Sequence, residues 1–102
     1  MSRRYSKDIL RRIRNQVDIQ EVVQALALPW KISEGYFRFL CPLCSEFNTA
    51  TNPRTNLARC FRCRRNFNPI DLVMAVRASS FVEAVDFLSN LTPANQSDQR
   101  TI

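Results

Sequence analysis

Four cysteines are the residues of this chain whose type and spacing best suit chemistry. They form two pairs in the pattern C-x2-C-x15-C-x2-C, at Cys41, Cys44, Cys60 and Cys63. Each C-x-x-C turn holds two thiolates on one side, and two such turns that face each other build a tetrahedral site of four sulfur ligands, which zinc prefers. All four positions are then filled by protein, so water and substrate are excluded. The spacing therefore predicts one structural zinc ion.

Three other interpretations of the cysteines compete with zinc. Two disulfides would use the same residues, but a reducing compartment disfavours them. A redox-active C-x-x-C pair would leave the second pair unexplained. Iron could occupy the same four-sulfur site, and only a metal analysis separates it from zinc.

The composition excludes most other chemistry. The chain has 102 residues, no histidine and one glycine, Gly35. It therefore has no imidazole base, no Ser-His-Asp or Cys-His nucleophile and no glycine-rich phosphate loop. It also lacks a convergent pair of acids. We predict one domain that is not an enzyme and that has no small-molecule substrate.

The hydropathy pattern predicts a cytoplasmic protein with no membrane partner. No apolar run approaches the roughly 18 residues that a membrane span needs. No apolar signal core follows the basic amino terminus before Arg11, so we expect no secretion. In a reducing compartment, thiols favour metal binding over disulfides.

The basic residues are concentrated in two segments. The formal net charge is +6, and residues 1–14 and 59–65 carry +5 and +4 of it against a slightly acidic remainder. Thirteen of the fifteen basic residues are arginine, which pairs with phosphate through two hydrogen bonds and stacks on bases. Four thiolates and one zinc ion would lower the total to about +4. This pattern favours a polyanionic partner, although such runs are also typical of solvated faces.

The elements around the cysteines are predicted as helices, a ribbon and helices. Residues 6–28 read as helical, with caps at Ser6 and Asp18 and a break near Asp18. Residues 30–67 read as a zinc ribbon, with a strand before each knuckle and a polar loop at 48–56.

The last elements are a second helical region and a tail. Residues 69–90 read as two helices, capped by Asn68 and by the capping box of Ser80 and Glu83. The predicted domain spans residues 1–91. Residues 92–102 read as a disordered polar tail.

Motifs along the chain resemble a known family. They are Val17-Asp18-Ile19, Cys41-Pro42-Leu43-Cys44, Cys60-Phe61-Arg62-Cys63, the run at 70–74 and the run at 81–88. Their order resembles the amino-terminal zinc-binding domain of bacterial DNA primases, the Cys-His-Cys-Cys type, from about residue 9 to residue 88. The resemblance implies a small α+β zinc ribbon in which an antiparallel sheet carries both knuckles and short helices flank it. It also implies contact with single-stranded template DNA.

The chain departs from this family in four places. Cys44 stands where the family has histidine, which keeps the number of ligands. Arg64 and Arg65 lie in a stretch that is glycine-rich in the family. The loop between the knuckles has Asn48-Thr49-Ala50-Thr51 in place of the family's T-P-S-F motif. The polymerase domain is missing, so we expect no primer synthesis by this chain itself.

The predicted function is a zinc-dependent module that binds single-stranded DNA in replication priming, alongside a replication enzyme as a further partner. Arginines would neutralise phosphates and exposed aromatics would stack on unpaired bases. Core packing is the alternative for each aromatic, and strand alternation places Tyr36 and Arg38 on one face and Phe37 and Phe39 on the other, so one pair should be core. The predicted contacts are Arg38, Arg59, Arg62, Arg64, Arg65, Trp30, Tyr36, Phe37 and Phe61.

The alternative function is a zinc-ribbon adaptor that binds a replication protein or another partner protein. In that case the zinc ribbon is only a scaffold. The adaptor hypothesis expects an exposed apolar patch on the helical faces around Val85 and Leu88.

Overall fold

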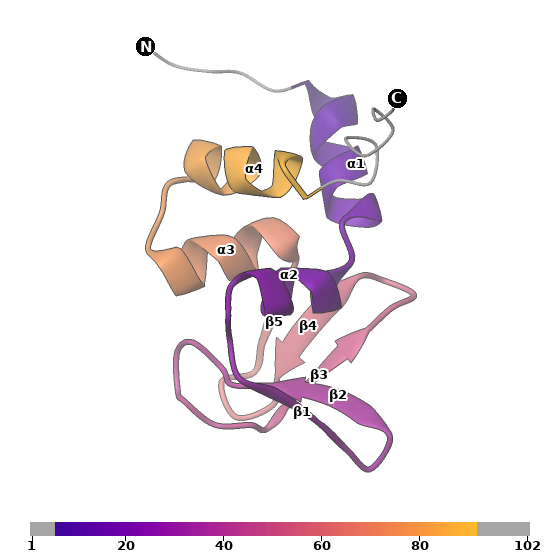
Figure 1. Ribbon diagram of the computed structural model, residues 1–102, viewed down its shortest axis with the longest axis vertical. Coiled ribbons are helices and arrows are strands. Elements are labelled where there is room, and N and C mark those ends of the chain that lie inside the picture. Colours follow the sequence, from indigo (N-terminus) through magenta and orange to yellow (C-terminus); the bar gives the residue numbers. More distant parts are fainter. Residues whose placement is uncertain (1–5, 92–102) are drawn as a thin grey trace.

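The chain order is two helices, five short strands and two more helices (Figure 1), in a computed structural model that describes residues 6–91. The strands pair antiparallel in two small sheets, and all four helices lie on one side of them. The predicted α+β fold with flanking helices is therefore confirmed. The predicted tail at 92–102 lies outside the described residues.

Helices α1 (Lys7–Gln16) and α2 (Ile19–Ala25) meet at the predicted break. The Ser6 hydroxyl accepts a hydrogen bond from the Ile9 N–H at 3.1 Å and begins α1. The Asp18 carboxylate accepts from the Gln20 N–H at 2.8 Å and begins α2. Asp18 therefore caps the second helix, as predicted, but through the second helical residue and not through the third, as a capping box would.

Helices α3 (Pro69–Arg77) and α4 (Phe81–Ser89) both begin with a capping box. The pair of Ser80 and Glu83 confirms the prediction. Asn68 and Asp71 make the same reciprocal pair, with Pro69 at the first helical position. In each box two backbone N–H groups are satisfied that the helix itself leaves free.

Five strands build the ribbon. β1 (Trp30–Ser33) and β2 (Tyr36–Phe39) form a hairpin, and β3 (Thr49–Asn52), β4 (Leu57–Cys60) and β5 (Arg65–Phe67) form a second sheet in that order. The hairpin turn has positive φ at both central residues, 57° at Glu34 and 81° at Gly35, as the turn type that matches strand twist requires. β3 lies inside the segment predicted as a loop, so that prediction is wrong there.

Thr49 joins the two sheets. Its hydroxyl accepts from the Phe39 N–H at 2.8 Å and donates to the Phe39 carbonyl at 2.6 Å. The Arg38 guanidinium donates to the Thr49 carbonyl at 2.8 Å. β2 and β3 therefore lie side by side, and the outward faces of the two sheets adjoin.

The core lies between the inner face of the strands and the helices. Phe39, Val22, Leu72 and Leu88 are among its largest fully buried side chains. Within residues 6–91 the helices cover only this inner face (Figure 1), and no helix lies over the opposite face of the strands. Within residues 6–91 no helix is long and apolar enough to cross a membrane.

Asn56 ties the ribbon to the first two helices. It is buried in the turn between β3 and β4, at a φ of 57° that asparagine tolerates better than most residues. Its side-chain amide donates to the carbonyls of Arg14 at 2.6 Å and Val17 at 2.7 Å, and its oxygen accepts from the Ile19 N–H at 2.8 Å. One side chain thus satisfies two carbonyls at the end of α1 and one N–H at the start of α2, and it fixes both helices to the ribbon.

Candidate metal centre and nucleic-acid interface

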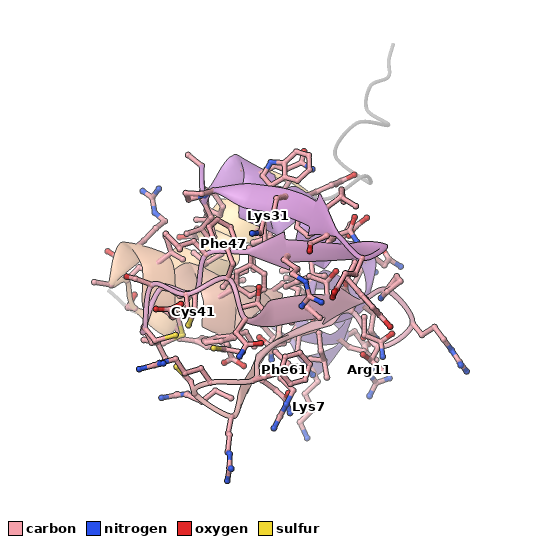
Figure 2. The ribbon with its side chains drawn as sticks, turned by 90° about the horizontal axis from the view of Figure 1, so that it is seen from below. Lys7, Arg11, Lys31, Cys41, Phe47 and Phe61 are labelled. Atoms are coloured by element: carbon pink, nitrogen blue, oxygen red, sulfur yellow. The ribbon has the colours of Figure 1, made fainter. Side chains whose placement is uncertain are left out.

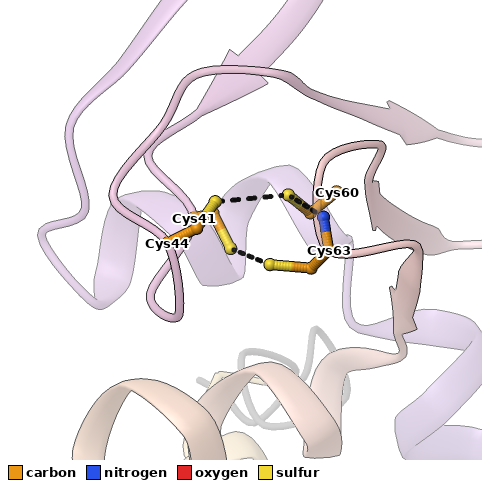
Figure 3. A group of neighbouring side chains, drawn as sticks. All are labelled: Cys41, Cys44, Cys60 and Cys63. Atoms are coloured by element: carbon orange, nitrogen blue, oxygen red, sulfur yellow. Dashed lines mark hydrogen bonds between the residues drawn. The ribbon is translucent and has the colours of Figure 1, made fainter.

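The two C-x-x-C turns bring all four cysteines together (Figure 3). The first turn follows β2 and the second joins β4 to β5. The Sγ atoms of Cys41 and Cys63 lie 3.8 Å apart, and those of Cys44 and Cys60 lie 3.6 Å apart. All four Sγ atoms lie within 4.8 Å of one another.

The donor set fits one zinc ion. A tetrahedral site with Zn–S bonds of about 2.3 Å places its sulfurs about 3.8 Å apart, close to the two short distances here. A disulfide would need an S–S distance of about 2.0 Å, and all four cysteines are free. The arrangement therefore disfavours the disulfide interpretation. Four protein sulfurs can complete the shell of one zinc ion, which makes the site structural.

Backbone N–H groups point at the first sulfur of each pair. The Leu43 N–H donates to the Sγ of Cys41, and the Cys63 N–H donates to the Sγ of Cys60, each at 3.4 Å. Such donors stabilise a thiolate without adding a charged side chain. Each turn therefore directs one backbone donor at a sulfur that can ligate the metal.

Burial makes two of the four thiols harder to ionise. Burial raises the pKa of Cys63 to about 12, and hydrogen bonds with the neighbouring thiols add to the effect. Burial also raises the pKa of Cys44. Burial acts in the same direction on Cys60, but the Cys63 N–H and the other thiols outweigh it, and the pKa of Cys60 is lowered. A divalent cation would reverse the penalty on Cys44 and Cys63, because a thiol that ligates a metal gives up its proton.

Strand alternation divides the predicted DNA contacts between two faces. Tyr36 is 55% exposed on the outward face of β2, whereas Phe37 is 7% exposed and Phe39 is fully buried. The expectation that one pair is core is met by the two phenylalanines. Phe37 is therefore not a stacking surface, because its ring packs in the core and stacks on Trp30 at 5.0 Å. That assignment is corrected.

Trp30 lies on the other side of the hairpin from Tyr36. It stands opposite Phe39 in the register and is 46% exposed at the rim of the core face. The structure therefore does not bring Trp30 together with Tyr36 or Phe61.

Three cation–aromatic pairs line the open face of the ribbon. The guanidinium of Arg38 lies 5.4 Å from the ring centre of Tyr36, and that of Arg59 lies 5.8 Å from the ring centre of Phe61. The ammonium of Lys31 lies 4.8 Å from the ring centre of Phe47 (Figure 2). We call these six residues the cation–aromatic face: Lys31, Tyr36, Arg38, Phe47, Arg59 and Phe61.

The sequence analysis missed Lys31 and Phe47. Lys31 stands directly opposite Arg38 in the hairpin, and paired residues of an antiparallel ladder share a face. The sequence could have indicated Lys31 through this pairing, because a two-residue turn at Glu34 and Gly35 sets Lys31 opposite Arg38. No pattern in the sequence points to Phe47, which lies after the first knuckle outside any helix or strand.

Three further arginines surround the second knuckle. Arg62, Arg64 and Arg65 are exposed, and within residues 6–91 none of them makes an ion pair; the side-chain ion pair seen there joins Arg38 to Glu34 at 3.3 Å. Their positive charges are therefore directed to solvent beside the cation–aromatic face, since Phe61 belongs to the same turn.

The two residues named for the adaptor surface are not exposed. Val85 and Leu88 are fully buried against the rest of the core. Of the large hydrophobic side chains exposed within residues 6–91, Phe81 belongs to α4 and the others lie elsewhere: Ile9, Trp30, Ile32, Tyr36, Leu43 and Phe61.

Comparisons with known proteins agree with this architecture. The model of the CHC2 zinc finger family matches residues 5–101. A DNA primase of Thermotoga maritima is 28% identical over 97 residues, which cover 93% of this chain and 17% of the primase. The chain thus spans about one sixth of the length of that relative. With paired cysteine knuckles on a ribbon and a match along nearly its whole length, the chain belongs to the CHC2 zinc finger family, in a version whose second ligand position holds Cys44.

Proposed function

We propose that the protein is a zinc-dependent module that binds single-stranded DNA in replication priming and has no polymerase activity of its own. Its zinc ligands are Cys41, Cys44, Cys60 and Cys63. The similarity to a DNA primase supports a role in replication priming. The closed four-sulfur site supports a structural role for the metal. Thiols kept free for a metal support a cytoplasmic location.

The observation that carries the proposal is the cation–aromatic face beside Arg62, Arg64 and Arg65, which make no ion pair within residues 6–91. Arginines neutralise phosphates and make affinity depend on salt. Exposed rings stack on bases, which a single strand offers and a duplex keeps stacked inside. Tyr36 and Phe61 are about half exposed, and Arg38 and Arg59 lie over them. This combination favours a single strand over a duplex.

The backbone at Arg64 adds a second argument. Its φ is 59°, in the left-handed region that costs a residue with a side chain about 1–2 kcal/mol. Glycine would avoid this cost. A cost that persists is often repaid by function. Ser45 has nearly the same φ, 60°, in the first turn, so the cost belongs to the metal-binding turn, and the exposed guanidinium of Arg64 is what the second turn adds for DNA.

The proposal is tested by titrating fluorescent single-stranded and duplex DNA with the zinc-loaded chain between about 50 and 200 mM salt. We expect tighter binding to the single strand, with an affinity that falls as salt rises. No binding at low salt, or an affinity for the single strand that salt does not change, would contradict it.

The absence of polymerase activity has its own test. Within residues 6–91 the one cluster of metal-ligating side chains is the closed cysteine site, so we expect no primer from this chain with template, nucleoside triphosphates and magnesium ions. A separate primase-type enzyme is then the partner that would synthesise the primer. Primer formed by the purified chain alone would overturn this part of the proposal.

A further inference from the structure

An open groove of about 630 Å³ runs along β3 and β4 of the ribbon, and Phe37 of β2 and Gln20 of α2 lie among the residues that line it. Tyr36 lines it from β2, and Phe61 lines it from the turn after β4. Between them, Ala50 of β3 stands opposite Arg59 of β4 in the ladder, so the short alanine side chain leaves the centre of the groove free. The volume lies within the range of about 300–1,000 Å³ that is common for ligand sites.

Two arginines beside this groove are held in place. The guanidinium of Arg38 donates to the Thr49 carbonyl at 2.8 Å and to Glu34 at 3.3 Å. The guanidinium of Arg59 donates to the side-chain oxygen of Asn66 at 3.0 Å. Both side chains are half-buried, so little further conformational entropy is lost when a ligand binds them.

The groove therefore offers a mostly apolar surface, two aromatic rings and the fixed cation of Arg59, and the fixed cation of Arg38 lies over the Tyr36 ring at its edge. A nucleotide has the matching parts, because its base is a flat aromatic ring and its phosphate is an anion. Arginine also recognises phosphate through two parallel hydrogen bonds. Most of the groove's surface is apolar, which suits the base more than the charged backbone.

We infer that this groove is a binding site for one unpaired nucleotide of a single strand. The base lies over Ala50 against Tyr36 or Phe61, and an adjoining phosphate is bound by Arg38 and Arg59. A base within a duplex cannot enter, because its two faces are covered by its neighbours. The inference rests on the proposed function and assigns the discrimination between single strand and duplex to this groove. The arginines of the second knuckle attract the phosphates of single strands and duplexes alike.

The test fills the groove. Ala50→Phe places a ring where the base would lie, and Ile32→Phe adds the same ring at an exposed strand position on the other face of the hairpin. For a thymidine oligonucleotide, we expect Ala50→Phe to weaken binding about 5- to 150-fold, the range for loss of one stacked base. We expect Ile32→Phe to bind within about twofold of the unchanged chain, and duplex affinity to stay within about twofold in both variants.

A second variant covers the case in which Ala50→Phe disturbs β3. Phe61→Leu keeps apolar bulk but removes the ring, and we expect at least about a fivefold loss for the single strand. Zinc content and circular dichroism show that each variant is folded.

The outcomes separate the two proposals. If the unchanged chain binds single strands and both groove variants bind equally well, the groove assignment is wrong and the proposed function stands. If the unchanged chain binds no single strand at low salt, the proposed function itself fails.

Discussion

The two C-x-x-C turns have the same backbone conformation. Apart from the cysteines, they differ in nearly every side chain. In both, the residue after the second cysteine donates its N–H to the carbonyl of the first cysteine, at 2.9 Å from Ser45 and 2.8 Å from Arg64. In both, that residue has a left-handed φ, 60° at Ser45 and 59° at Arg64. Each turn also directs one N–H at its first sulfur at 3.4 Å.

The side chains around this shared backbone separate the two turns. The first turn presents the neutral residues Leu43 and Ser45, whereas the second presents Phe61, Arg62 and Arg64. Four sulfurs and a backbone conformation are sufficient for the metal site, so the remaining positions are free to vary. The metal therefore uses both turns alike, whereas the proposed DNA contact uses only the second.

The largest expected effect falls on both turns equally. Cys41→Ser and Cys60→Ser each remove one sulfur from a four-ligand site, and zinc binding in small zinc domains contributes about 10–16 kcal/mol to folding. We expect both variants to lose the metal and the fold, measured by zinc content and circular dichroism. A folded, metal-free Cys60→Ser protein would show that the metal is not structural.

Acidification should weaken zinc binding through both turns. The pKa values of Cys44 in the first turn and Cys63 in the second are raised, the latter to about 12. Below these pKa values each thiol carries a proton that zinc must displace, so affinity falls as pH falls. Release of two protons corresponds to about a 100-fold loss of affinity per pH unit.

Competition with a chelator between pH 6 and pH 8 measures this dependence. Calorimetry in buffers of different ionisation enthalpy counts the protons released. An affinity that does not change with pH would contradict the cluster described above.

The next largest effect is on single-stranded DNA affinity, and it should arise from the second turn and not from the first. Replacing Arg62, Arg64 and Arg65 together by glutamine removes three positive charges beside the second pair of cysteines. We expect single-stranded DNA affinity to fall about 10- to 100-fold and the slope of log affinity against log salt to fall by about 2. Leu43→Gln, at an exposed position of the first turn, is the control and should leave DNA affinity unchanged. Equal losses in the two variants would contradict a one-sided interface.

Some parts of the structure can be predicted from the sequence and others cannot. The cysteine site follows from spacing alone, because a C-x-x-C turn has few conformations that bind a metal. The helix starts at Ser6, Asp18, Asn68 and Ser80 also follow from local residues, because a cap satisfies N–H groups only a few positions away.

The strand β3 could not be predicted in this way. Its polar residues have no apolar alternation, and the strand forms because Thr49 pairs with Cys60 and bonds Phe39 from a different sheet. Alternation placed Tyr36 and Phe37 on opposite faces, but the helices that bury one face come from distant parts of the chain. The groove over Ala50 depends on three strands at once, and no local pattern encodes it.

The smallest expected effects are a gain in stability that both turns share and a loss of DNA affinity that only the second turn shows. Ser45→Gly and Arg64→Gly each relieve a left-handed backbone, and because glycine also loses more entropy on folding, we expect a gain of up to about 1 kcal/mol. Denaturant unfolding of the zinc-loaded protein measures it. Only Arg64→Gly should also weaken single-stranded DNA binding, by a few-fold. A loss of stability in either variant would contradict the strain assigned here.

The most direct test of the account is a map of backbone amide chemical shifts while the zinc-loaded protein is titrated with a thymidine oligonucleotide at low salt. We expect shifts to concentrate around Arg38, Arg59 and the second turn from Phe61 to Arg65. Leu43 in the first turn and the residues of α4 should change little. Shifts centred on Leu43 and α4, or no shifts at all, would contradict the claim that the second turn and the open face of the ribbon bind the strand.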